Sequence, residues 1–242
     1  MSLSDIQWKR LLSQVRDGRC VPFIGSGVAT PTLPTGGELA EELSKAYNLP
    51  LDASNDLSAV AEHIAIAANS TREPKDHFAE RARKAVAPPH YTNLAELPIK
   101  LFVTTNYDDL LEQALRKAGK HPQLEIPAWN GYILHQHRNE VSAMSRDEGY
   151  DPSVDYPLIL HLHGHYKYPA TMVMTDSDYA EFLSAWRAHK NWLVPDGLHY
   201  LFGLHRVPWT PSLGVLTESE VRHGDATDVQ SGVQGGSRPT GG

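Results

Sequence analysis

Three short apolar runs constrain the fold of this 242-residue chain most strongly. They are Cys20–Ile24, Leu101–Thr105 and Leu158–Leu162, and stretches with helical spacing separate them. Short apolar runs are typical of strands buried on both faces, and strands that alternate with helices form parallel sheets. We therefore predict an α/β fold with a doubly wound, mainly parallel sheet of the Rossmann-like class.

The segments between and after these runs divide the chain into a folded part and a tail. Apolar residues recur at helical spacing through residues 37–87, which predicts an inserted helical module that ends before Pro88 and Pro89. Residues 127–157 show no sustained period, so we expect a long loop around one short element. We expect one domain over residues 1–195. In residues 196–242 Gly, Pro, Ser and Thr accumulate, which predicts a poorly ordered tail with Tyr200-Leu201-Phe202 as a candidate last strand.

Capping residues mark three of the predicted helices. Ser4 and Gln7 have the spacing of a capping box before a helix that ends near Asp17-Gly18. A helix from about Asp108 to Gly119 follows the second apolar run, and a helix capped by Thr175 follows the third. The first helix is predicted to bury one stripe of side chains, namely Trp8, Leu11, Leu12 and Val15.

Composition excludes several classes of protein. The single cysteine, Cys20, cannot form an internal disulfide or a zinc site that needs two or more thiolates. With 22 Lys and Arg against 29 Asp and Glu, the net charge of -7 offers no large basic face to nucleic acid. The charged start does not resemble a signal peptide, and no apolar run reaches the roughly 18 residues of a membrane span. We expect a cytoplasmic protein with neither nucleic acid nor membrane as a partner.

Gly25-Ser26-Gly27 follows the first apolar run. Glycine lets the backbone approach a phosphate closely, and free N–H groups at the start of a following helix attract anions. However, Thr30 stands where the usual dinucleotide fingerprint has its third glycine, and no acidic residue ends an obvious second strand to hold a ribose. Phosphate binding and an ordinary strand-to-helix turn therefore both remain open for this motif.

Thr105, Asn106 and Asp108 follow the second run, at the carboxyl end of a strand, where open α/β sheets bind their ligands. An amide and a carboxylate two residues apart suit hydrogen bonding to ribose hydroxyls. The same side chains are also common helix caps. The residues alone leave both interpretations open.

Histidines gather at the third run, in His161-Leu162-His163-Gly164-His165. Because side chains alternate along a strand, one interpretation is a metal site that His161 and His163 share, with His135 and His137 as a second such pair. In another, only His163 acts, as an acid–base group that titrates near neutral pH. The remaining histidines are then structural residues that are buried and hydrogen-bonded.

Taken together and in this order, the motifs resemble the sirtuin superfamily, and more closely its bacterial sirtuin-like NAD-hydrolysing branch in phage defence. The resemblance covers about residues 18–190. It is carried by Phe23-Ile24-Gly25-Ser26-Gly27, Val103-Thr104-Thr105-Asn106-Tyr107-Asp108, Leu160-His161-Leu162-His163-Gly164 and Thr175-Asp176-Ser177-Asp178-Tyr179.

The resemblance implies a sirtuin-type sheet with NAD as the substrate and no metal. It makes Asn106 and His163 the catalytic pair, in which Asn106 positions the water or the ribose and His163 acts as general base. The cofactor-binding residues that it implies are Gly25, Ser26, Gly27, Thr105, Asp108 and Gly164.

Two departures from the family refine this expectation. Deacylating sirtuins commonly carry a four-cysteine zinc module, and this chain has no cysteine beyond position 20. Hydrolysis of NAD to nicotinamide and ADP-ribose, with NAD depletion as the output, is therefore favoured over deacylation. The family's Gly-x-Ser loop is missing after Leu201-Phe202-Gly203, so a non-catalytic NAD or ADP-ribose sensor stays an alternative, beside a metal-dependent hydrolase built on the His-x-His pairs. The resemblance also implies self-association or a separate sensor protein as partner.

Overall fold

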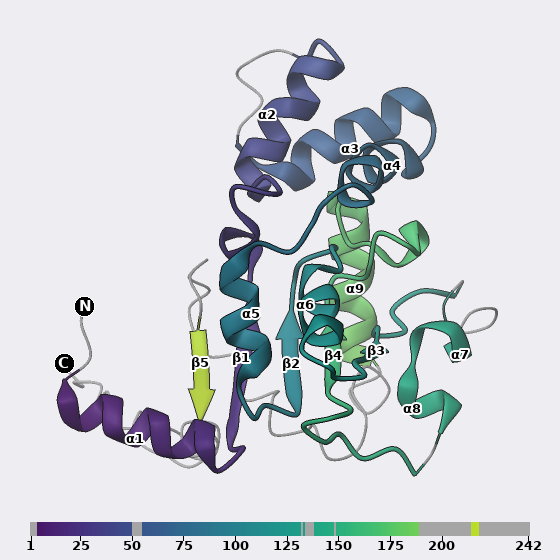
Figure 1. The fold of residues 1–242 in the computed structure, drawn as a ribbon. Helices are drawn as coiled ribbons and strands as arrows, with labels where there is room; N and C mark the ends of the chain where they lie inside the picture. Colours follow the sequence, from purple (N-terminus) through teal and green to yellow (C-terminus); the bar gives the residue numbers. More distant parts are fainter. Residues whose placement is uncertain are drawn as a thin grey trace, which may run out of the picture.

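The computed structural model describes residues 4–49, 55–131, 133, 138–147, 149–188 and 214–217. This part of the chain is built on a five-stranded sheet with the order β3-β4-β2-β1-β5 (Figure 1). β1, β2, β3 and β4 pair in parallel, whereas β5 runs antiparallel beside β1. The mainly parallel sheet predicted from the three apolar runs is therefore confirmed. The strands are β1 (Cys20–Ile24), β2 (Leu101–Thr104), β3 (Gln123–Glu125), β4 (Leu158–His161) and β5 (Gly214–Thr217).

Helices precede, separate and follow these strands. Those of at least two turns are α1 (Asp5–Arg16), α2 (Gly36–Ala46), α3 (Leu57–Ala68), α4 (Arg72–Ala82), α5 (Pro89–Glu96), α6 (Leu110–Lys117) and α9 (Asp176–Ala188). Shorter elements are the 3-10 helices η1 (Ser26–Ala29) and η3 (Pro169–Thr171) and the short helices α7 (Arg138–Val141) and α8 (Ala143–Arg146).

Alternate side chains of the strands enter two hydrophobic cores, one on each face of the sheet. Phe102 and Ile159 belong to one core, and Val103 and Leu160 belong to the other. α5 and α6 contribute to the first core, and α9 lies behind the sheet and contributes Phe182 to the second (Figure 1). Helices on both faces make the sheet doubly wound, as predicted.

The parallel register aligns the carboxyl ends of three strands. Ile24 of β1 pairs with Thr104 of β2, and Thr104 pairs with His161 of β4. The residues that follow these strands therefore leave the sheet side by side at one edge. Ligands of open α/β sheets bind at this edge.

α2, α3 and α4 lie within the predicted module of residues 37–87 and stand beyond this edge of the sheet (Figure 1). Several polar contacts hold the module to the start of α9, among them the bond that the Ser177 hydroxyl donates to Glu62 of α3 at 2.7 Å. The Lys75 ammonium of α4 lies 2.8 Å from Oδ2 of Asp178, and both side chains are buried. The Ser58 hydroxyl of α3 donates to Oδ1 of Asp176 at 2.6 Å. The module is therefore attached to α9, which covers the face of the sheet opposite to α5 and α6.

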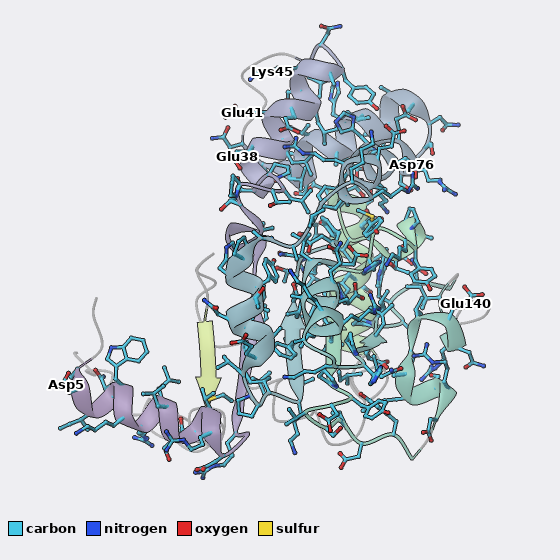
Figure 2. The ribbon with its side chains drawn as sticks, in the orientation of Figure 1. Asp5, Glu38, Glu41, Lys45, Asp76 and Glu140 are labelled. Carbon is cyan, nitrogen blue, oxygen red and sulfur yellow. The ribbon has the colours of Figure 1, made fainter. Side chains whose placement is uncertain are left out.

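α1 has the predicted cap without the predicted burial. The Ser4 hydroxyl accepts from the Gln7 backbone, and the Gln7 side chain accepts from the Ser4 backbone, which completes the capping box. No residue of the helix is buried, and Trp8 and Leu12 are 49% and 55% exposed. The predicted buried stripe is therefore wrong. Figures 1 and 2 show why: α1 extends away from the other helices, with Asp5 at its far end, so none of the other described helices covers its apolar side chains.

Two other segments differ from expectation. Pro89 does not stop the preceding helix, because α4 already ends at Ala82; it is instead the first residue of α5, a position where proline is tolerated. Val86, expected on the fourth helical stripe, lies beyond the end of α4 and is 72% exposed. Residues 127–157 contain both α7 and α8, one short helix more than expected.

β5 lies in the segment from which we expected little packed structure. Its backbone pairs with β1 from Cys20 opposite Thr217 to Phe23 opposite Gly214. The tail therefore contributes an edge strand to the sheet, which corrects that expectation. The candidate strand Tyr200-Leu201-Phe202 and the remainder of residues 196–242 lie outside the described residues.

Within the described residues, no helix has both the length and the apolar character needed to cross a membrane.

Candidate active site

A cavity of about 840 Å³ opens at the carboxyl edge of the sheet. The loops after β1, β2 and β4 form one side of it, and residues of the helical module and α9 form the other. The register explains why residues far apart in the sequence meet here. Most of the predicted site residues line this cavity, namely Gly25, Ser26, Gly27, Thr105, Asn106, Asp108 and His163.

The Gly25-Ser26-Gly27 turn leads from β1 directly into η1. The Val28 N–H donates to the Gly25 carbonyl at 3.1 Å, and a Cβ at Gly25 would meet no atom within 4 Å. The protein's own packing therefore does not require glycine at position 25. A backbone that approaches a bound phosphate would require it.

The backbone of Asn106 is held in place while its side chain lines the cavity. Its N–H donates to Oγ1 of Thr104 at 3.0 Å, and its carbonyl lies 3.0 Å from Nδ1 of His161. Oδ1 of Asn106 is buried and has no hydrogen-bond partner among the described residues. An unpaired buried acceptor costs about 1–3 kcal/mol. Asn106 therefore brings a buried acceptor without a partner among the described residues to the border of the cavity.

Asp108 combines the two roles left open by the sequence. It lines the cavity, and its Oδ1 accepts a hydrogen bond from the Leu110 backbone at 3.0 Å, at the start of α6. Burial raises the pKa of Asp108 to about 6, against the opposing effect of the Leu110 hydrogen bond. One carboxylate oxygen thus binds the first backbone N–H of α6, from the residue before the N-cap Asp109, while the side chain borders the cavity.

His163 lies in the turn after β4. Its ring packs edge-on against Tyr179 and Phe182 of α9, with ring centroids 5.3 Å and 5.7 Å away. Burial lowers the pKa of His163 to about 4, so the imidazole is neutral at pH 7 and the titration near neutral pH expected from the sequence is wrong. A neutral ring has one nitrogen lone pair to accept a proton, which is the form that a general base requires.

His161 and His163 diverge, so the metal pair predicted from them is wrong. β4 ends at His161, and the alternation of a strand does not continue through the turn that follows. His161 lies close to His165, with ring centroids 4.9 Å apart, whereas His163 packs on α9. The second predicted pair, His135 and His137, lies outside the described residues.

Gly164, expected to bind the cofactor, is not among the described residues that line the cavity. Its φ is +82°, and a Cβ there would lie 2.0 Å from the carbonyl oxygen of Thr171. The close approach of these two backbones therefore requires glycine. The Val173 N–H donates to the His163 carbonyl at 2.9 Å, so the same turn also positions His163. A contact between Gly164 and a ligand stays a prediction.

Several lining residues were not found from the sequence. They come from the module and from α9, and include Asp56, Ser58, Phe78 and Tyr179. The one signal was the helix cap at Asp56, whose carboxylate accepts from the Ser58 backbone at 3.0 Å. Capping residues are common, so this signal does not identify a cavity. Only the packing of the module against the sheet edge brings these residues to the site.

Comparisons with known proteins agree with this site. A family model described as a SIR2-like domain matches residues 100–207, a range that includes Asn106, Asp108 and His163. The protein named NAD(+) hydrolase ThsA from Acinetobacter baumannii is 31% identical over 113 residues, which are 46% of this chain and 23% of that protein. The resemblance to sirtuin-like NAD-hydrolysing proteins is therefore confirmed.

Two further relatives with the same name come from Bacillus cereus and Enterococcus faecium. They are 23% and 24% identical over 177 and 180 residues, and each match covers 72% of this chain and 34% of the relative. The matches therefore span only about a quarter to a third of the length of these relatives.

Proposed function

We propose that this chain is the catalytic part of an NAD hydrolase, which releases nicotinamide and ADP-ribose. The observation that carries the proposal is that two residues line one cavity: Asn106, whose buried amide oxygen has no partner among the described residues, and His163, whose imidazole is neutral. The SIR2-like match spans both residues, and the relatives described above are named NAD(+) hydrolases.

The lining of the cavity suits a cationic nicotinamide. Among the described lining residues, the carboxylates are Asp56 and Asp108, and no lysine or arginine is present. Aromatic rings of Phe78, Tyr107 and Tyr179 also border the space. Carboxylates and aromatic faces both attract a positively charged ring. In this arrangement the turn at residues 25–27 binds the pyrophosphate, and Thr105 and Asp108 form hydrogen bonds with ribose hydroxyls.

The two central side chains divide the work of hydrolysis. Cleavage of a glycosidic bond passes through a centre with oxocarbenium character. The amide oxygen of Asn106 accepts a hydrogen bond from the attacking water or from a ribose hydroxyl and so fixes its orientation. As the water oxygen bonds to the ribose carbon, the electron pair of the broken bond leaves with nicotinamide, which departs neutral. The proton of the water passes to His163.

The wider biological setting follows from the resemblance. We assign residues 1–195 to the NAD-binding domain, with residues 37–87 as the module that covers the cavity. Depletion of NAD during phage defence is the proposed output, in the cytoplasm and with NAD as substrate and no metal. Self-association or a separate sensor protein is the proposed means of control.

The test is release of nicotinamide from NAD by purified protein, measured by chromatography. Asn106→Ala and His163→Ala should each lower the rate by about 100-fold or more, the usual contribution of a positioned acid or base. Matched controls are Asn93→Ala and His121→Ala, which change exposed residues away from the cavity and should leave the rate near that of the wild type. Calorimetry that shows NAD binding without turnover would instead indicate a sensor, and full activity in both site variants would refute the proposed roles.

A further inference from the structure

A second group of ionisable side chains lies directly beside Asn106, outside the cavity lining. Glu112 of α6, His161 of β4 and His165 of the following turn are 5%, 1% and 1% exposed. Nitrogen and oxygen atoms of the three lie within 4.8 Å of one another. Burying three such groups together is costly unless they serve one another or a neighbour.

The hydrogen bonds define where the protons of the two rings lie. Nδ1 of His161 is 3.0 Å from the carbonyl oxygen of Asn106, and a carbonyl only accepts, so His161 carries a proton on Nδ1 and donates it. The Lys167 N–H donates to Nδ1 of His165 at 3.1 Å. A neutral His165 therefore carries its proton on Nε2, from which it donates to Oε2 of Glu112 at 3.4 Å.

This arrangement argues against a metal ion held by all three side chains. A histidine that binds a metal through Nε2 commonly carries a hydrogen on Nδ1 and donates it to a nearby acceptor. His161 meets that condition, but Nδ1 of His165 is itself the acceptor of the Lys167 N–H. Nε2 of His161 has no hydrogen-bond partner among the described residues and lies 3.9 Å from Oε1 of Glu112. The three side chains thus form a chain of polar contacts that ends on Asn106.

We propose that His161, held in a buried cluster with Glu112 and His165, is a positioning residue for Asn106; this inference rests on the proposed function. The His161 ring fixes the peptide group that follows Asn106, and the bond from Asn106 to Thr104 Oγ1 fixes the one that precedes it. With both peptide groups fixed, the direction of the Cα–Cβ bond of Asn106 is fixed, so only the side-chain torsions remain to place its amide. A displacement of about 1 Å at a reacting group commonly lowers a rate by about 100-fold.

Substitutions of His161 separate this role from simple packing. The side-chain amide nitrogen of Asn lies near the position of Nδ1, so His161→Asn keeps the hydrogen-bond donor to Asn106. The amide nitrogen of Gln lies near the position of Nε2 instead, and His161→Leu has no donor. We expect His161→Leu and His161→Gln to lose about 100-fold in kcat with KM for NAD within about threefold, and His161→Asn to stay within about tenfold of the wild type. Thermal unfolding of each variant shows whether it is folded.

A second measurement does not depend on activity or on a variant that folds. A long-range proton–nitrogen correlation spectrum of the wild-type imidazoles should show His161 protonated on Nδ1 and His165 on Nε2. If the wild type releases no nicotinamide, the proposed function fails. The spectrum still reports whether Nδ1 of His161 carries the proton that it donates to Asn106. The inference is overturned by a His161 ring protonated only on Nε2, by equal rates in the three variants, or by binding of one Zn²⁺ that Glu112→Gln abolishes.

Discussion

Alanine substitutions at Gly164 and Gly119 would separate two reasons why a backbone position requires glycine, conformational strain and steric overlap. Both glycines have left-handed backbones, with φ of +82° and +81°. An alanine in this region costs about 1–2 kcal/mol. At Gly119 a Cβ would meet no atom within 4 Å, so this strain is the whole expected effect.

At Gly164 the added methyl group would overlap the backbone of η3. It would lie 2.0 Å from the carbonyl oxygen of Thr171, 2.3 Å from its carbonyl carbon and 2.7 Å from the nitrogen of Met172. These atoms cannot rotate away as a side chain can, so the two backbone segments must separate by roughly 1 Å. Overpacking of this kind adds about 1–3 kcal/mol. We therefore expect Gly164→Ala to lower the free energy of unfolding by about 2–5 kcal/mol, against about 1–2 for Gly119→Ala.

The same displacement should reach the candidate site. The segment after Thr171 donates from Val173 to the carbonyl of His163, so moving it moves His163. Folded Gly164→Ala should release nicotinamide about 100-fold more slowly, while Gly119→Ala keeps the wild-type rate. Urea denaturation followed by circular dichroism measures the stabilities, and chromatography measures the rates. Equal destabilisation of the two variants within about 0.5 kcal/mol would refute the steric argument.

Two further predictions concern buried charges. Lys75→Met should lower the free energy of unfolding by about 3–5 kcal/mol, because it leaves the buried Asp178 carboxylate without its cation, whereas Arg72→Met at an exposed ion pair should change it by less than about 1 kcal/mol. Urea denaturation compares them, and equal losses would contradict the reasoning. Because burial raises the pKa of Asp108 to about 6, its carboxylate gains a proton as the pH falls through 6, and kcat/KM for NAD should fall there. Asp108→Asn should lower kcat/KM and remove this decline, and a decline that persists in the variant would assign it to another group.

The sequence predicted the positions of the strand ends better than it predicted the histidine pairing. Apolar runs and the residues after them located the three strand ends, because buried parallel strands leave a strong signal and their carboxyl ends meet at one edge. The partner of His161 was missed, since alternation was extended past the end of β4. In the structure the chain turns after His161, so His165 rather than His163 comes beside it.

Burial against distant elements was the other source of error. Trp8 and Leu12 have the spacing of a buried stripe, but periodicity shows only which side chains share a face, not whether another element covers it. Glu112 shows the opposite error: it is a charged residue, yet it lies on the buried face of α6, next to two histidines from another part of the chain. The pairing of β5 with β1 likewise depends on a tertiary contact that no local pattern indicates.

The register of β2 against β4 has a consequence for how such a site tolerates change. It is maintained by apolar side chains that alternate between two cores, such as Ile159 in one core and Leu160 in the other, and a shift of one residue would exchange the cores. Asn106 and His163 are thus kept in line by residues that never touch a substrate. A single polar replacement deep in the sheet, at Leu160, would therefore misalign groups that it does not contact.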